Sequence, residues 1–286
     1  MSAVALGLVV FSALLHASWN ALTKRSGDGL VFIWSFLLAS LVVYAIPFAV
    51  LINRHPPGAT GLLFALISGA IHVAYFSLLA LSYRRADLSF AYPVARGTGV
   101  LLSPILAVPI FGDRPTVVAW IGIAAILGGI VWINAPILSH SVRKLGLHRV
   151  LAGPPLLTGF TIASYSLVDA GGSRRVQPVV YLYLIFVVVV VAMLPYMLTR
   201  RWDTVKASAK HPRTAIIAGT ASFSTYLIVL TALRIAPVSY VVPVREVSIV
   251  FAALIGMRAL GESLNRSRLA ACGLVTLGVM LIGVGG

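Results

Sequence analysis

The sequence predicts an all-α membrane protein of ten transmembrane helices, arranged as two inverted repeats of five helices each. The first observation is composition: 59% of the 286 residues are hydrophobic and 10% are charged, and the mean hydropathy is +1.00. Too few polar side chains are present to cover the surface of a water-soluble fold of this length. The second is that apolar runs of the ~20 residues needed to cross a bilayer recur along the whole chain.

The third observation is an internal duplication. Four sequence blocks recur in the same order, 17–19 as 163–165, 80–84 as 230–234, 88–94 as 238–244 and 111–113 as 260–262. All four lie at offsets of 146 to 150 residues, a period too long for a solenoid and typical of the halves of a transporter. We expect a first repeat at 1–135, a linker at 136–149 and a second repeat at 150–286.

The distribution of charge gives the expected orientation. Because each repeat has an odd number of spans, the second copy enters the membrane from the opposite side to the first. Loops on one face carry 15 basic residues, and loops on the other carry five, which are Arg54, Arg114, Arg174, Arg175 and Arg234. Basic loops stay in the cytoplasm, so both termini are expected outside. Topology and lipid headgroups then account for the net charge of +15 without a nucleic-acid partner.

The expected spans are 4–23, 30–52, 62–83, 88–111, 117–133, 151–168, 178–198, 214–233, 238–257 and 269–284. In the first span, His16, Trp19 and Asn20 share one helical face. Polar groups are unfavourable against lipid, so this face looks inward, where either helix packing or substrate contact would use it. The second span is scaffold. The third places His72 and Tyr75 on one stripe, for packing or for lining a cavity.

The fourth span departs most strongly from a regular helix. It contains three prolines and two glycines, which are Pro93, Pro104, Pro109, Gly97 and Gly99. Each proline removes a backbone donor and each glycine weakens the helix, so we expect a kinked or interrupted helix with hinges at Pro93, Gly97 and Gly99.

Arg96 lies inside this fourth span, close to Tyr92. A charge within a membrane helix needs water, an opposite charge or an anionic ligand. A guanidinium binds a carboxylate through two parallel hydrogen bonds, which suits a substrate. Snorkelling to the membrane boundary, or an ion pair with Glu246, are the structural alternatives.

The sixth to eighth spans repeat this pattern with fewer charges. Tyr165 occupies the position of the tryptophan in the first span, and Tyr226 aligns near the tyrosine of the third. Asp169 is expected at the outer surface, paired with Arg174 or Arg175, in preference to a role as a proton carrier. The seventh span has no polar face and is expected to be scaffold.

The ninth span contains the counterpart of the proline-and-arginine segment. Pro243 is a further candidate hinge, and Arg245 and Glu246 follow it. Adjacent residues point about 100° apart on a helix, so these two charges need separate partners. Glu246 aligns with Arg96 of the first repeat, which makes either an ion pair between the two or a shared proton and substrate site reasonable. The fifth and tenth spans are glycine-rich and are expected to pack closely.

Several of these motifs together carry a family resemblance. They are His16-Ala17-Ser18-Trp19-Asn20 followed by Lys24, Pro93 with Gly97 and Gly99, and the span ends Gly112-Asp113 and Gly261-Glu262. With the ten-span plan, they make the chain similar to the EamA-type branch of the drug/metabolite transporter superfamily. Its length and repeat plan are similar to bacterial exporters of amino acids, including the aromatic amino-acid group. The resemblance implies a central cavity lined by the first, third, fourth, sixth, eighth and ninth spans.

The site residues favour a small zwitterion as the substrate. Aromatic surface comes from Trp19, Tyr75, Tyr92, Tyr165 and Tyr226, with His16, Asn20 and His72 as polar contacts. Arg96 or Arg245 would bind a carboxylate, and Glu246 an ammonium group. We therefore expect a secondary transporter that exports neutral or aromatic amino acids by alternating access. The sequence has no Walker motif, so the energy is expected to come from a gradient or from the substrate itself.

Other functions fit the sequence less well. A multidrug exporter of lipophilic cations would bind them at Glu246 alone, and another small-metabolite transporter is a further alternative. An enzyme is not expected, because neither His-Glu-x-x-His nor Gly-x-Ser-x-Gly occurs. The single Cys272 provides no metal site, and no metal or cofactor is expected. We expect a monomer in the inner membrane of a bacterial cell, in contact with lipid, its termini periplasmic.

Overall fold

A computed structural model describes residues 1–23, 28–85, 88–145, 153–210, 212–260 and 266–285 of the chain. Over these residues the fold is built from helices, with no strand. The helices of the first half are α1 (Ala3–Thr23), α2 (Gly29–Val43), α3 (Ala45–Arg54), α4 (Ala59–Arg85), α5 (Leu88–Phe111) and α6 (Val117–Leu145). Those of the second half are α8 (Pro154–Ser173), α9 (Pro178–Arg200), α10 (Trp202–Ala209), α11 (Pro212–Ile235), α12 (Val238–Val244), the 3-10 turn η1 (Arg245–Val247), α13 (Ser248–Leu260) and α14 (Arg266–Gly285).

The described helices support a membrane protein of several spans without confirming the exact count of ten. Over the described ranges, seven helices are long and apolar enough to cross a bilayer, or eight if the bent pair α2–α3 is one span. In α1 the described apolar stretch is Ala3–Ser18, and α8 is outside this set. Proline, glycine, serine and threonine are frequent in α8, and Asp169 adds a charge, so its mean hydropathy is low.

The second expected span is two helices that meet at 59°. Pro47, in the first turn of α3, has no N–H to donate, and its ring would clash with the carbonyl of Val43, where α2 ends. Tyr44 stands at the bend. Its ring stacks on Phe223 at 3.9 Å, and its hydroxyl lies 2.7 Å from Ser224 Oγ. The bend therefore packs against α11 of the other half.

The helix interruption expected in the fourth span is found instead in the ninth span, its counterpart in the second repeat. Despite three internal prolines, α5 is one continuous helix. In the second half, α12 ends at Val244, and η1 separates it from α13. The break falls directly at Arg245 and Glu246, so both charged residues lie on a tightened turn rather than on a regular α-helix.

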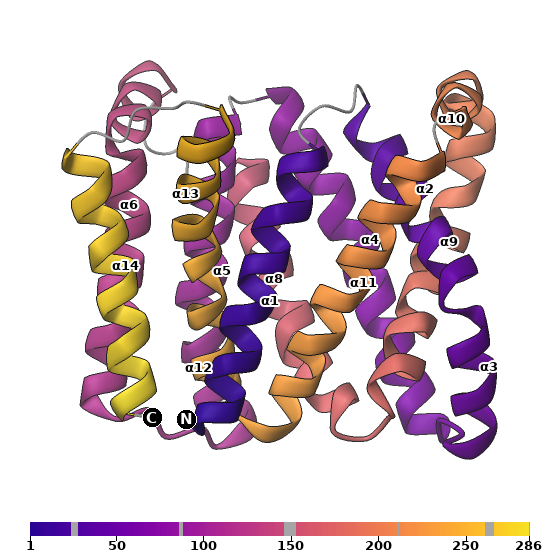
Figure 1. Ribbon diagram of the computed structural model, residues 1–286, viewed down its shortest axis with the longest axis horizontal. Coiled ribbons are helices and arrows are strands. Elements are labelled where there is room, and N and C mark those ends of the chain that lie inside the picture. Colours follow the sequence, from indigo (N-terminus) through magenta and orange to yellow (C-terminus); the bar gives the residue numbers. More distant parts are fainter. Residues whose placement is uncertain (24–27, 86–87, 146–152, 211, 261–265, 286) are drawn as a thin grey trace.

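Packing between the halves has two-fold character. α4 packs on α8 as α11 packs on α1, and α5 packs on α8 as α13 packs on α1. The pair α9 and α4 likewise matches the pair α2 and α11. Exchanging the two halves thus converts one set of contacts into the other. Figure 1 shows α1 beginning, and its counterpart α8 ending, at the lower end of the helices, as expected for an inverted repeat.

α6 and α14 pack directly on each other through glycines. A Cβ added at Gly122 would lie 2.7 Å from the carbonyl oxygen of Gly278, and one added at Gly278 would lie 2.5 Å from that of Gly122. Small residues let membrane helices approach this closely. A Cβ added at Gly273 would meet no atom within 4 Å, so Gly273 is not part of this contact.

The Gly112-Asp113 motif joins the two halves. Gly112 ends α5 with a φ of +68°, a conformation that glycine adopts without strain. Asp113 then accepts hydrogen bonds from the backbone N–H (3.0 Å) and the hydroxyl (2.8 Å) of Ser239 in the first turn of α12. Its repeat counterpart, Gly261-Glu262, lies outside the described residues.

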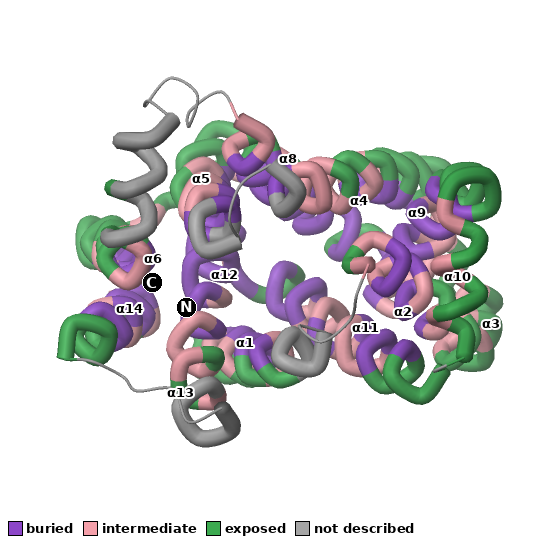
Figure 2. Tube along the Cα trace, turned by 90° about the horizontal axis from the view of Figure 1, so that it is seen from above, coloured by how far each residue is buried: buried purple, intermediate pink, exposed green. Residues whose placement is uncertain are grey.

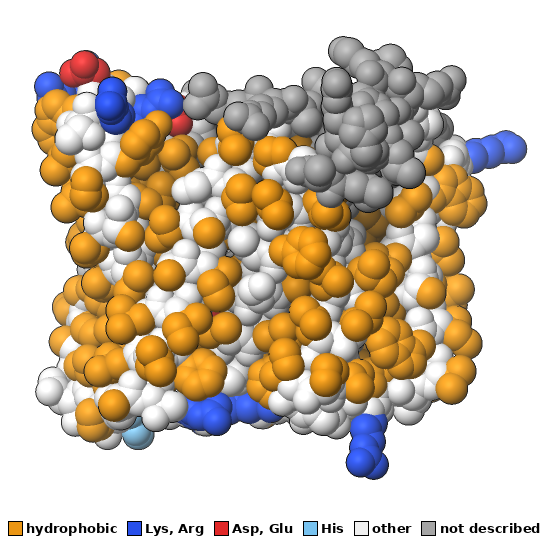
Figure 3. Space-filling view, turned by 180° about the vertical axis from the view of Figure 1, so that it is seen from behind, with side chains coloured by type: hydrophobic (Ala, Val, Ile, Leu, Met, Phe, Trp, Pro, Cys, Tyr) orange, Lys and Arg blue, Asp and Glu red, His pale blue; other side chains and the backbone are white. Residues whose placement is uncertain are grey.

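The surface is that of a protein surrounded by lipid. Buried residues face the inside of the bundle, and exposed ones lie on the outer faces of the helices (Figure 2). Apolar side chains cover the middle of the face seen in Figure 3, with Lys and Arg towards the two ends. Lipid, which solvates apolar side chains, accounts for such a belt.

Candidate functional site

Four of the expected site residues form one aromatic cluster: His72 and Tyr75 of α4, Tyr165 of α8 and Tyr226 of α11. His72 stacks on Tyr165 with ring centroids 4.3 Å apart, and lies edge-on to Tyr226 at 5.8 Å. Tyr75 and Tyr226 each meet Tyr165 edge-on, at 5.5 and 6.3 Å. These are favourable arrangements for aromatic rings. The rings pack against one another, so a substrate must displace some of them to bind between them.

The predicted ion pair between the repeats is present. Arg96 Nε lies 3.2 Å from Glu246 Oε2, and the two side chains are 9% and 4% exposed. The angle at this contact does not make a hydrogen bond, and Glu246 Oε2 accepts none from the described residues. Opposite charges approach closely here with imperfect hydrogen-bond geometry. The pair ties α5 to η1.

Arg245 has different partners from the adjacent Glu246, as predicted from the angle of about 100° between neighbouring positions on a helix. Its Cζ atom lies 5.4 Å from the centroid of the Tyr226 ring, within the range of a cation–π interaction. It is half-buried, and within the described part of the chain no carboxylate lies within salt-bridge distance of it. Arg96 is committed to Glu246, so Arg245 is the better candidate for an anionic group.

Asp169 corrects the sequence interpretation, which placed it at the outer surface paired with Arg174 or Arg175. Its exposure is 0%. Ser68 donates to Oδ1 at 2.5 Å, Tyr181 donates to Oδ1 at 3.0 Å, and Tyr226 donates to Oδ2. Arg174 instead donates to a backbone carbonyl of α11, and Arg175 to one of α8. Helices α4, α9 and α11 thus cover the acid with hydroxyl groups.

Glycine makes this close packing around Asp169 possible. A Cβ at Gly172 would collide with the ring of Tyr181, and one at Gly171 would lie 2.6 Å from Phe64. A larger residue at position 172 would push Tyr181 away from the carboxylate. The sequence does contain one signal for the site: Tyr165 and Asp169 are four residues apart, so they share a helical face.

His72 connects this carboxylate to the aromatic cluster. Its Nδ1 lies 2.9 Å from the backbone carbonyl of Ser68 and 3.2 Å from the Ser68 hydroxyl, which itself donates to Asp169. Tyr226 makes the second connection, because its hydroxyl binds Asp169 while its ring lies under Arg245. The cluster, the acid and the arginine therefore form one continuous site.

The remaining expected site residues have varied placements. His16 lies within electrostatic range of both Arg96 and Arg245. The side chains of Trp19, Asn20 and Tyr92 lie outside the described residues.

The four expected hinge residues also lie inside helices. Pro93 is buried in α5, and Pro243 is buried near the end of α12. In α5, Gly97 has open space beside it, whereas Gly99 packs against Ile162 of α8.

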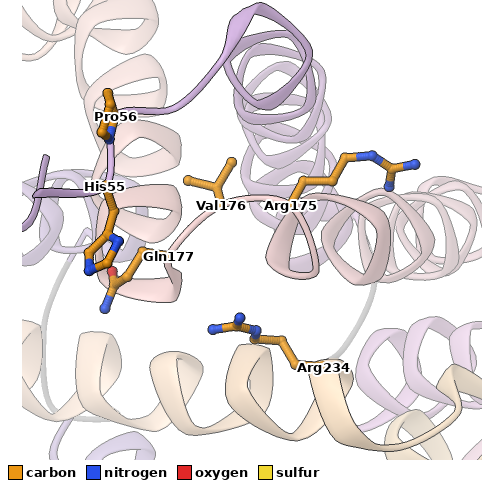
Figure 4. A pocket seen from close by; sticks show the side chains of 6 residues that line it. All are labelled: His55, Pro56, Arg175, Val176, Gln177 and Arg234. Atoms are coloured by element: carbon orange, nitrogen blue, oxygen red, sulfur yellow. The ribbon is translucent and has the colours of Figure 1, made fainter.

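A cavity of about 450 Å³ opens at the ends of the helices, away from the aromatic cluster. Its lining comes from the α3–α4 loop, the α8–α9 turn and the end of α11: His55, Pro56, Arg175, Val176, Gln177 and Arg234. In Figure 4, Arg234 lies along α11 towards Gln177, and Arg175 points the other way. Among the described residues, no three of His, Cys, Asp and Glu gather as metal ligands.

These features define a helical membrane protein with a polar, aromatic site at the interface of two repeats. The sequence model of the EamA-like transporter family matches residues 3–135 and again 151–284. The chain therefore belongs to the EamA-like transporter family, and it is a multi-pass membrane transporter of small metabolites.

The comparison with solved structures supports the fold and says nothing about the substrate. A protein of known crystal structure is similar with a TM-score of 0.68 and 18% sequence identity, over 98% of this chain and 97% of that one. At this identity, the likeness is one of fold. No curated protein matches the sequence significantly.

Proposed function

We propose that this transporter exports neutral, and preferably aromatic, amino acids by alternating access through the site between its repeats. Arg245 carries the proposal: it is a half-buried guanidinium beside an aromatic cluster, and no carboxylate of the described residues lies within salt-bridge distance of it. A guanidinium binds a carboxylate through two parallel hydrogen bonds. The rings of Tyr75, Tyr165 and Tyr226 supply an apolar surface for the substrate side chain.

The break at η1 supports the same mechanism. Interrupted helices at the repeat interface commonly carry the substrate sites of transporters with inverted repeats. Arg245 and Glu246 lie at such a break, and Glu246 pairs with Arg96 of the other repeat. Rocking one repeat against the other would change the surroundings of both charges together. Pro93, Gly97, Gly99 and Pro243 are the positions proposed to absorb the motion.

The test is exchange in proteoliposomes. Vesicles filled with unlabelled L-phenylalanine should take up labelled L-phenylalanine and L-tryptophan from outside, and more slowly labelled L-leucine. Arg245→Gln should raise the KM about 10–100-fold, because a hydrogen bond to a charged group contributes ~1.5–3 kcal/mol. Wild-type vesicles that exchange none of these amino acids would refute the proposal.

Lipophilic cations are the second candidate substrate. The buried Asp169 and the rings above it form a site in which cation–π attraction would also act. Labelled tetraphenylphosphonium in the same vesicles distinguishes the two. Under the cation hypothesis, Arg245→Gln should increase tetraphenylphosphonium transport by removing a like charge, whereas amino-acid exchange should be absent.

We also propose that the protein acts as a monomer in the bacterial inner membrane, with both termini in the periplasm. The excess of basic residues in the loops of the opposite face supports this orientation. Alkaline phosphatase fused after Gly286 should be active and green fluorescent protein fused there should be dark, with the reverse result contradicting the orientation.

A further inference from the structure

Asp169 differs from the other acids that the structure describes. Asp28, Asp203 and Glu246 have Arg201, Lys206 and Arg96 as basic partners, at 3.4, 3.5 and 3.2 Å. Asp113 is half-buried and caps α12. Asp169 is 0% exposed, and its partners are the hydroxyls of Ser68, Tyr181 and Tyr226. Within the described ranges, it is the buried acid with no basic group within salt-bridge distance.

Hydroxyl partners suit a carboxyl group that changes its protonation state. A guanidinium or ammonium can only donate, so it cannot accept a hydrogen bond from the O–H of a protonated acid. A serine or tyrosine hydroxyl both donates and accepts. When Asp169 is ionised, all three hydroxyls donate to it. When a proton is on Oδ2, that new O–H donates to the Tyr226 oxygen, and the Tyr226 proton turns to another acceptor.

Tyr226 links this change to the substrate site. Its hydroxyl binds Asp169 Oδ2, and Arg245 lies over its ring at 5.4 Å. Arg96 and Glu246 neutralise each other, so Arg245 and ionised Asp169 remain as one positive and one negative group. A zwitterionic amino acid matches these two groups: its carboxylate would meet Arg245, and its ammonium group would be attracted by Asp169.

We propose that Asp169 is the proton-coupling site of this transporter and exchanges one proton for one amino-acid molecule in each cycle. The inference rests on the proposed function. The ammonium group of the substrate favours ionised Asp169, and so substrate and proton compete for the same state of the site. A proton is taken from water on one side, held at Asp169 while the empty site reorients, and released to water on the other side when substrate binds. Proton and substrate therefore move in opposite directions.

The neighbouring titratable groups belong to α8 itself and to five other elements. His72 of α4, Tyr181 of α9 and Tyr226 of α11 face Asp169, as does Tyr165 of α8 itself. Arg245 of η1 lies one ring further away, over Tyr226. On α5, Arg96 is held by Glu246. His72 is the neighbour that could also bind a proton near neutral pH, so His72→Gln belongs in the test.

The test uses the full-length protein in proteoliposomes with labelled L-phenylalanine. An acidic interior and an alkaline exterior should drive wild-type uptake several-fold above equilibrium, because protons leave as substrate enters. Asp169→Asn keeps the shape of the side chain and cannot carry the proton. It should abolish this accumulation. Exchange at equal pH and saturating substrate should remain, with a higher KM because the ammonium group of the substrate loses its negatively charged partner. The control Asp203→Asn, on an acid that is 99% exposed, should behave as wild type.

Several results would overturn the proposal. They are wild-type accumulation that ignores the pH gradient, accumulation driven by the opposite gradient, accumulation retained in Asp169→Asn, and loss of coupling in His72→Gln with coupling intact in Asp169→Asn. A failure of the proposed function would give a different result: the wild-type protein would not exchange labelled L-phenylalanine even at equal pH.

A second measurement needs neither transport nor a stable variant. Infrared difference spectra of the wild-type protein should contain the carbonyl band of one buried carboxylic acid at low pH. That band should disappear at high pH and on addition of L-phenylalanine. If Asp169→Asn folds, it should lack the band. A wild-type spectrum without a titrating carboxylic-acid band would overturn the proposal even if Asp169→Asn does not fold.

Discussion

Removing one charge of the Arg96–Glu246 pair is expected to destabilise the protein strongly. Glu246→Gln keeps the size of the side chain and removes its charge. The two side chains are 9% and 4% exposed, and the charged atoms are 3.2 Å apart. With an effective dielectric constant of about 20, two unit charges at this distance attract by ~5 kcal/mol. Losing one partner of a buried pair typically costs ~3–5 kcal/mol, because the other charge stays buried.

The double substitution makes this prediction specific. Arg96→Met with Glu246→Leu removes both charges, and it should be within about 1 kcal/mol of wild type or more stable, since Glu246 Oε2 accepts no hydrogen bond from the described residues. Unfolding in mixed detergent micelles, followed by tryptophan fluorescence, measures both. The reasoning is refuted if Glu246→Gln loses less than about 1 kcal/mol, or if the double variant is the less stable of the two.

Three further predictions concern packing and hydrogen bonds. Gly278→Val should destabilise the protein by ~1–3 kcal/mol by forcing α14 away from α6, and Gly273→Val, which meets open space, should not; micellar unfolding compares them. Asp113→Ala should lose ~0.5–2 kcal/mol by leaving the start of α12 uncapped, and faster amide hydrogen exchange there would report it; unchanged exchange would contradict the cap. Tyr181→Phe removes one of the three hydrogen-bond donors to the Asp169 carboxylate, and the variant should be ~1–3 kcal/mol less stable in the same unfolding assay. Stability equal to wild type would mean that the Tyr181 hydroxyl does not donate to Asp169 in the membrane-embedded protein.

Much of the architecture follows from simple features of the sequence. Each expected span corresponds to a helix or to a broken pair of helices, and most of these helices are apolar over the length that a membrane span needs. Alignment of the two repeats also predicted the Arg96–Glu246 pair, since equivalent positions approach each other at the interface of inverted repeats. The separate partners of Arg245 and Glu246 followed from the angle between adjacent helical positions.

The burial of Asp169 did not follow, and the reason is positional. The residue is four positions from the end of α8, where an acid ordinarily reaches water. Apolar length does not reveal which neighbouring helices extend far enough to cover that turn. Here α4 and α9 cover it, with Ser68 and Tyr181 as donors. Gly172 leaves room for the Tyr181 ring, but the sequence of α8 alone does not show that α9 places a tyrosine there.

The prolines were also only partly informative. Three prolines in α5 leave it continuous, whereas the segment with Pro243 alone breaks into α12, η1 and α13. A membrane helix tolerates proline where neighbouring groups satisfy the freed carbonyls, which is a property of the packing and not of the sequence. The bend at Tyr44 depends in the same way on partners from α11.

The most direct test of the account is the exchange of labelled L-phenylalanine by proteoliposomes that contain wild-type protein or Arg245→Gln. The account predicts exchange by the wild type and a KM about 10–100-fold higher for the variant, because the carboxylate loses its charged partner. Exchange with an unchanged KM in Arg245→Gln would contradict the assigned site. No exchange of any neutral amino acid by the wild type would contradict the proposed substrate.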